Sequence, residues 1–213
     1  MNNVIERNGK NMSFVGMHIM NDGIIAFADS KASIKYDNGI IKEDINRGLI
    51  CKIFKNNKFV FVTYGNNEIF SSENKMNIED YIEQNLEESM DYEKFFMDLN
   101  SAIQNNQAKY NDGEYNFIIG SKNNNKYFLE KCKIKQNEPI EFYDKTYEKQ
   151  IYTGGDIFYT NLYSRQNFYY DVDIDEYAQI IKTFIESLVK AKDSLDKYHY
   201  NPVGLPVQIE IFQ

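Results

Sequence analysis

The chain has 213 residues, of which 42% are hydrophobic and 15% aromatic, so it can build one domain with a sizeable core and is not a disordered chain. Its formal net charge of −8 disfavours nonspecific binding to nucleic acid or to an anionic membrane, because phosphate contacts need clustered lysine and arginine. The polar N-terminus lacks a signal-peptide core, and no apolar run reaches transmembrane length. Only two cysteines are present, without CxxC spacing, which favours a reducing, cytoplasmic environment.

The first 65 residues have the character of consecutive antiparallel hairpins. Asp22-Gly23 is a strong hairpin signal, and Asn56-Asn57 marks a second tight turn. A largely polar loop is expected between the two hairpins, from Lys35 to Gly48. The β-prone runs that these turns join are residues 12–20 with 23–28, and 50–55 with 58–64.

Helical periodicity begins after Gly65. Apolar residues recur at helical spacing in three segments, and two-residue alternation or β-prone composition marks the remaining strands. The predicted helices are residues 77–88, 91–109 and 174–195. The predicted strands are 115–121 and 126–134, which form a hairpin, then 149–153 and a final strand over 206–212.

This order of strands, helices, strands, helices and strand predicts an α+β fold. Because most strands are joined by hairpins, the sheets should be mainly antiparallel. No linker rich in proline, glycine or serine interrupts the chain. The simplest organisation is a short N-terminal extension over residues 1–11, which a processed protein would lose as a propeptide, and a single domain over residues 12–213.

Three segments in this order resemble the proteasome family, which includes proteasome β subunits and the bacterial two-ring ATP-dependent protease core. The first is the hairpin that runs from Val15-Gly16-Met17 to Ala28-Asp29-Ser30-Lys31-Ala32. The second is Cys51-Lys52-Ile53-Phe54-Lys55 with the later Tyr64-Gly65, and the third is Val203-Gly204-Leu205-Pro206-Val207 after the last helix. The likeness extends over nearly the whole chain from about residue 12, although each motif alone is short.

The resemblance implies a four-layer αββα sandwich of the N-terminal-nucleophile hydrolase fold. It also implies a homo-oligomeric ring, an ATPase regulator as partner and a peptide or protein substrate, without a cofactor or metal. In this family the freed α-amine of the first residue is the base for its own hydroxyl. A lysine beside the nucleophile lowers its proton affinity, an aspartate orients that lysine, and backbone N–H groups bind the oxyanion.

By this resemblance Asp29 matches the family aspartate and Lys52 matches the family lysine. Counting back from Asp29 without a gap places the nucleophile at Ser13, whereas counting from Val15-Gly16 places it at Met12. The hairpin is one residue longer than is usual, and a β-bulge would absorb the difference. With Ser13 the chain is a serine- or threonine-type peptidase, and with Met12 it has no nucleophile.

Other positions bear on activity. By the same resemblance Gly155 stands where the family has a supporting serine, and either Asp193 or Asp196 would correspond to a later aspartate near the nucleophile. His18 and His199 lack metal-ligand spacing, so a hydrogen-bonded structural role is expected for both.

Two alternatives to a ring-forming peptidase stay open. One is a non-catalytic scaffold subunit of the same fold, and the other is an amidohydrolase acting on a small amide, since fold does not fix substrate.

Cys51 directly precedes Lys52 and should point to the opposite face of the sheet, which predicts a small core residue rather than a nucleophile.

Overall fold

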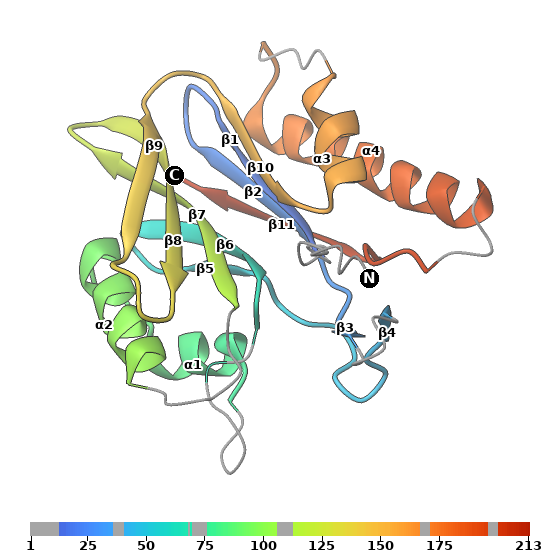
Figure 1. The fold of residues 1–213 in the computed structure, drawn as a ribbon. Coiled ribbons are helices and arrows are strands. Elements are labelled where there is room, and N and C mark those ends of the chain that lie inside the picture. The colour runs from blue at the N-terminus through green and yellow to red at the C-terminus, as the bar shows by residue number, and fades with distance from the viewer. Residues whose placement is uncertain are drawn as a thin grey trace, which may run out of the picture.

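The structure is a computed structural model that describes residues 13–35, 41–67, 69, 76–105, 113–166, 171–195 and 200–213. Within these residues the chain forms two main antiparallel sheets, a small two-stranded sheet and flanking helices (Figure 1). The first main sheet contains, in spatial order, β10 (Ile151–Gly155), β1 (Phe14–Ile19), β2 (Ile24–Asp29) and β11 (Val207–Phe212). The second contains β5 (Ile53–Lys55), β6 (Phe59–Gly65), β7 (Glu114–Asn123), β8 (Lys126–Lys135) and β9 (Glu141–Thr146).

The layers are held by three apolar clusters. One lies between the two sheets, where Val15, Met17 and Ala26 meet Val62 and Ile118. A second lies between the first sheet and the helices α3 (Ile157–Ser164) and α4 (Ile174–Leu195). The third lies between the second sheet and the helices α1 (Ile78–Asn85) and α2 (Tyr92–Gln104). The stack is therefore helix, sheet, sheet, helix, and Figure 1 shows the two helical layers on opposite sides.

The alternation of side chains in β1 explains why this strand is buried on both faces. All six of its residues are buried. Val15, Met17 and Ile19 enter the cluster between the sheets, while Phe14 enters the cluster beneath the helices. Successive strand residues point to opposite faces, so a strand between two apolar layers needs apolar residues at nearly every position.

The predicted α+β sandwich with mainly antiparallel sheets is confirmed. Several elements were not predicted: the small sheet of β3 (Ser33–Lys35) and β4 (Ile41–Glu43), strand β9 and helix α3. The expected loop over 35–48 therefore contains strand residues, and the strand predicted from residue 50 begins only at Ile53. Elements with few apolar residues, such as β4 and β9, lack the periodicity on which the predictions depend.

The sheet register brings several strand ends to one end of the sandwich. Phe14 opens β1 opposite Gly155, which closes β10. Val207 opens β11 opposite Asp29, which closes β2. The second sheet adds the start of β5 and the end of β6, since Ile53 lies opposite Val62. Side chains at these termini can meet although they are far apart in sequence.

Candidate functional site

A buried ion pair joins the two sheets at this end. The Nζ atom of Lys52, just before β5, lies 2.7 Å from Oδ1 of Asp29, the last residue of β2. The side chains are 3% and 0% exposed, respectively. The same ammonium donates to the carbonyl of Lys31 at 3.0 Å. The structure therefore brings together the two charged residues that the resemblance singles out.

The Asp29 carboxylate is also tied to three backbone N–H groups. Its Oδ1 accepts from Phe14 N at 2.9 Å, and its Oδ2 accepts from Lys31 N at 3.1 Å and Gly204 N at 3.3 Å. A carboxylate that accepts several hydrogen bonds from different directions is held in one orientation. Asp29 thus holds three segments in place near Lys52: the start of β1, the turn that follows β2, and the chain that leads into β11.

Ser13 directly precedes β1 and lines the same pocket as Lys52. Its carbonyl accepts from Asp156 N at 2.6 Å, so its backbone is anchored to the end of β10. Thr63 and Ser33 add hydroxyl groups to the lining of this pocket. The lining of the pocket thus includes both a partly exposed serine and a buried lysine.

The pairing of β1 with β2 runs without interruption from Val15 opposite Ala28 to Ile19 opposite Ile24. The expected β-bulge is therefore wrong for these strands, and an extra residue can lie only in the turn or beyond the paired positions. Met12, the alternative to Ser13, lies outside the described residues, as does the extension over 1–11.

Gly155 has a positive φ of 102°, and a Cβ built on it would lie 1.7 Å from the carbonyl oxygen of Ser13. A side chain at this position would displace the start of β1, because φ in this range is strained for every residue except glycine. The position matched to a supporting serine therefore has no room for one in this backbone.

A hydrogen-bonded chain connects the pocket to α4. Lys31 lines the pocket, and its ammonium donates to the carbonyl of Asn201 at 3.0 Å. The Asn201 amide donates to Asp193 Oδ1 at 2.9 Å and contacts the hydroxyl of Tyr159. Asp193 is thus linked to the pocket through Asn201, and Asp196 lies outside the described residues.

The predictions for His18 and Cys51 had different outcomes. His18 is fully buried, its Nε2 lies 2.7 Å from the Tyr163 hydroxyl, and burial lowers its pKa to about 3, so the predicted hydrogen-bonded structural role is confirmed. Cys51 is exposed, so the prediction of a core residue is wrong. His199 lies outside the described residues.

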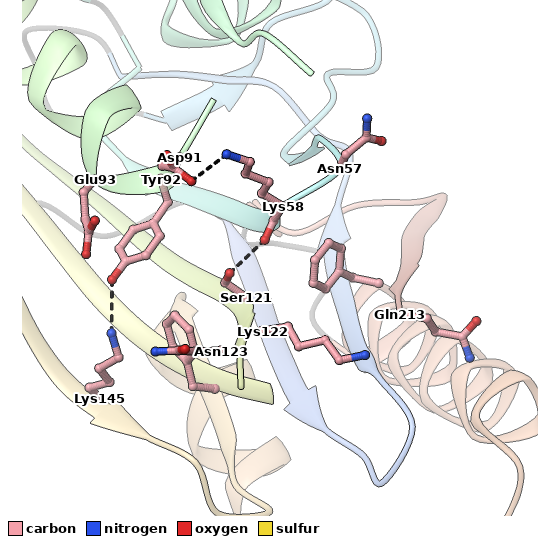
Figure 2. Close-up of a pocket in the computed structure, with 12 residues that line it drawn as sticks. Asn57, Lys58, Asp91, Tyr92, Glu93, Ser121, Lys122, Asn123, Lys145 and Gln213 are labelled. Atoms are coloured by element: carbon pink, nitrogen blue, oxygen red, sulfur yellow. Dashed lines mark hydrogen bonds and ion pairs between the residues drawn. The ribbon is translucent and has the colours of Figure 1, made fainter. Parts of the chain in front are cut away.

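A larger pocket of about 420 Å³ opens at the other end of the sandwich, between the β5–β6 turn and the start of α2 (Figure 2). Its lysines already have partners: Lys58 pairs with Asp91 at 2.9 Å, and Lys145 donates to the Tyr92 hydroxyl at 3.1 Å. None of the residues matched through the family resemblance lines it. The smaller pocket beside Ser13 is therefore the candidate site.

Comparison with known proteins adds no assignment: no family model matches the sequence, and no curated protein matches it. In the described part of the chain, no group of three or more histidine, cysteine, aspartate or glutamate residues is arranged to hold a metal ion. None of the helices in that part combines the length and the apolar character needed to cross a membrane.

Proposed function

We propose that the chain is an amide hydrolase of the N-terminal-nucleophile type, in which Ser13 is the nucleophile once the peptide bond before it is cleaved. The observation that carries the proposal is the buried Lys52–Asp29 pair, of which Lys52 lines the same pocket as Ser13. A serine alone is a weak nucleophile, and a fixed positive charge beside it favours the ionised form.

Each residue has a separate task in the proposed reaction. Hydrolysis of the bond between residues 12 and 13 consumes one water and frees the α-amine of Ser13. This amine takes the hydroxyl proton as Oγ bonds to the substrate carbonyl carbon, and it then gives the proton to the departing amine as the C–N bond breaks. Water next hydrolyses the ester, which restores the hydroxyl. Lys52 stabilises the developing negative charge, and Asp29 keeps the ammonium in place.

Peptides are the proposed substrates. Through the family resemblance, the proposal also includes assembly into a homo-oligomeric ring and an ATPase regulator as its partner. One observation is compatible with assembly: Ile157 and Phe158, at the start of α3, are 74% and 47% exposed. Exposed apolar side chains that are adjacent in this way are common where protein surfaces associate. The mass of the native assembly tests this part independently of catalysis.

The competing function is a non-catalytic subunit of the same fold, and Gly155 favours it because that position cannot supply a supporting hydroxyl. The mass of the purified native chain separates the two functions. A peptidase should lose residues 1–12, and Ser13→Ala should abolish both this processing and amide hydrolysis. Ser33→Ala is the matched control, since Ser33 lines the same pocket but bonds the Tyr200 hydroxyl at 2.7 Å.

A folded protein that keeps residues 1–12 and hydrolyses neither peptide nor small amide probes would refute the enzyme proposal. Hydrolysis of small amides without hydrolysis of peptides would support the nucleophile while changing the substrate class. Equal loss of activity in Ser13→Ala and Ser33→Ala would assign the effect to the pocket as a whole, not to the nucleophile.

A further inference from the structure

The larger pocket, at the other end of the sandwich from the candidate site, has three lysines in its lining. Lys58 directly precedes β6, Lys122 lies near the end of β7, and Lys145 lies in β9, so separate parts of the second sheet bring them to the same hollow (Figure 2). The lining also contains the two carboxylates of Asp91 and Glu93. The lining therefore has a positive balance of charge, although the whole chain has a net charge of −8.

Two of these lysines are held in place while keeping donors for a ligand. Lys122 donates to the Tyr127 hydroxyl at 3.1 Å and forms no ion pair with any residue that the structure describes. Lys145 donates to the Tyr92 hydroxyl at 3.1 Å and lies 3.4 Å from Oε2 of Glu130. An ammonium has three N–H donors, and these contacts use at most two of them in either lysine.

The third lysine has a partner that a ligand can replace. The side chains of Lys58 and Asp91 are 46% and 67% exposed, and exposed ion pairs stabilise a protein only weakly. Asp91 occupies the N-cap of α2 with an extended backbone, but its carboxylate makes no capping hydrogen bond. Aspartate is among the preferred N-cap residues, so a displaced Asp91 could bond the first N–H groups of its own helix. An incoming anion can therefore take Lys58 without leaving Asp91 unpaired.

The kind of cation in the lining favours phosphate over a carboxylate as the bound anion. A guanidinium fork matches the two oxygens of a carboxylate, whereas a lysine acts as a point charge. The cations that line this pocket are all lysines, and they come from different strands. A phosphate group, with three strong acceptor oxygens that point in different directions, suits such an arrangement.

The size and the polar lining of the pocket describe the rest of the ligand. Its volume of about 420 Å³ is in the range of pockets that hold small organic molecules, so a phosphate ion alone would leave most of it empty. The side chains of Asn57 and Asn123 line it and form no hydrogen bond with any described residue. Amide groups both donate to and accept from hydroxyl groups. The organic part of the ligand should therefore be rich in hydroxyls.

We propose that the larger pocket binds a phosphate monoester of a sugar or another polyol. Lys58 and Lys122 bind the phosphate group, and Lys145 adds positive charge to the wall of the pocket. Asn57 and Asn123 bind the hydroxyls of the ligand. This binding site is separate from the candidate site for hydrolysis, so the inference goes beyond the proposed function and does not depend on it.

Calorimetric titration of the purified full chain with glucose 6-phosphate, glucose and inorganic phosphate tests the proposal. The titrations are made at about 0.15 M salt, which screens a general attraction between charges. We expect one molecule of glucose 6-phosphate to bind per chain, with a Kd of about 1 mM or lower. Inorganic phosphate should bind at least about fivefold more weakly, because it lacks the hydroxyl contacts, and glucose should show no measurable binding.

Substitutions in the lining then locate the bound molecule. Lys58→Gln and Lys122→Gln should each weaken the binding of glucose 6-phosphate about tenfold, the value of one charge-assisted hydrogen bond. Asp91→Asn should strengthen it by up to about fivefold, because asparagine can still cap α2 but no longer competes for Lys58. Lys94→Gln is the matched control, since Lys94 is exposed in the same helical turn, lies outside the lining and changes the net charge equally.

Several results would overturn the proposal. Absence of binding by both phosphate compounds, or equal binding of glucose and glucose 6-phosphate, would exclude a phosphate site. Equal affinities for inorganic phosphate and glucose 6-phosphate would exclude recognition of the polyol. Equal weakening in Lys94→Gln and Lys58→Gln would assign the binding to the general charge of the surface, and weaker binding in Asp91→Asn would contradict the displacement of Asp91. Thermal melting of each variant shows that the comparison is made on folded protein.

Discussion

Replacing Lys52 by methionine should destabilise the protein far more than a surface lysine substitution does, and the contacts give the size of the effect. The change removes the ammonium from a carboxylate that is fully buried, together with its 2.7 Å and 3.0 Å hydrogen bonds. Breaking a buried pair by removing one partner costs about 3–5 kcal/mol. Three backbone N–H donors still hold the Asp29 carboxylate, so we expect the lower value, about 3 kcal/mol, in Lys52→Met.

Replacing Asp29, the other partner of the pair, should lower the free energy of unfolding by more than replacing Lys52 does. Asp29→Ala leaves a buried ammonium with the Lys31 carbonyl as its acceptor. It also removes the acceptor of the backbone N–H groups of Phe14, Lys31 and Gly204. We therefore expect about 5 kcal/mol for Asp29→Ala. The double variant should cost about 1–3 kcal/mol less than the sum of the single variants, because neither charge is then left unpaired.

Urea unfolding followed by circular dichroism, at one fixed protein concentration, measures these free energies of unfolding. Lys55→Met, at the end of β5, is the matched control, since Lys55 pairs with Glu210 but both side chains are more than 40% exposed. Exposed pairs contribute about 0–1 kcal/mol. Equal losses in Lys52→Met and Lys55→Met, or a smaller loss in Asp29→Ala than in Lys52→Met, would refute the reasoning.

Three further predictions use other parts of the structure. Gly155→Ala should lower the melting temperature much more than Gly48→Ala, because both glycines have positive φ but only Gly155 would drive its Cβ into a backbone oxygen; equal shifts in calorimetry would contradict this. Burial lowers the pKa of His18 to about 3, so the unfolded chain binds the extra proton between about pH 6.5 and 3. Stability should therefore fall as pH drops through this window, by up to about 1.4 kcal/mol per pH unit, and urea unfolding of His18→Gln should lose that part of the slope. Cys51 should react with a thiol reagent in the folded protein, but slowly for an exposed residue because partial burial of the sulfur raises the pKa of its thiol, whereas the other cysteine is buried and should react only on unfolding; two thiols that react at the same rate in a colorimetric assay would disagree with the structure.

Much of the fold follows from local signals in the sequence. The Asp22-Gly23 turn and its flanking apolar runs predict the first hairpin, and the helical spacing of apolar residues predicts α2 and α4 within a few residues at either end. These signals are strong because the elements bury a face. Where burial is partial, as in β9, the strand exists because β8 supplies a backbone partner, and no pattern in its own residues indicates this.

Helix α3 was missed for a different reason. Its residues are mostly aromatic and β-branched, a composition that is common in strands. Its start was nevertheless detectable, because Asp156 follows two glycines and its carboxylate accepts from Phe158 N at 2.9 Å, as an N-cap does. Packing of Tyr159 and Tyr163 against the first sheet then stabilises a helix that its intrinsic propensity does not favour.

The candidate site, like the fold, could be predicted from the sequence only in part. Asp29 and Lys52 could be paired in advance because they belong to motifs whose order resembles a family. Glu79, in the first turn of α1, lines the same pocket as Ser13 and Lys52, but nothing near it in the sequence distinguishes it from the neighbouring acids of α1. Its carboxylate accepts a hydrogen bond from Arg47, which is 32 residues away in the sequence. Such three-dimensional coincidences have no local pattern.

The Asp29 carboxylate also explains why a well-predicted pair does not by itself establish chemistry. With three backbone N–H bonds it organises the start of β1 and the approach to β11, and a folded protein needs this whether or not it is an enzyme. Stability measurements on the pair therefore test the structure, whereas only the fate of the bond before Ser13 tests catalysis. A variant such as Lys52→Arg, which keeps a positive charge but changes its shape, should preserve more stability than Lys52→Met while still impairing a reaction that depends on the position of the ammonium.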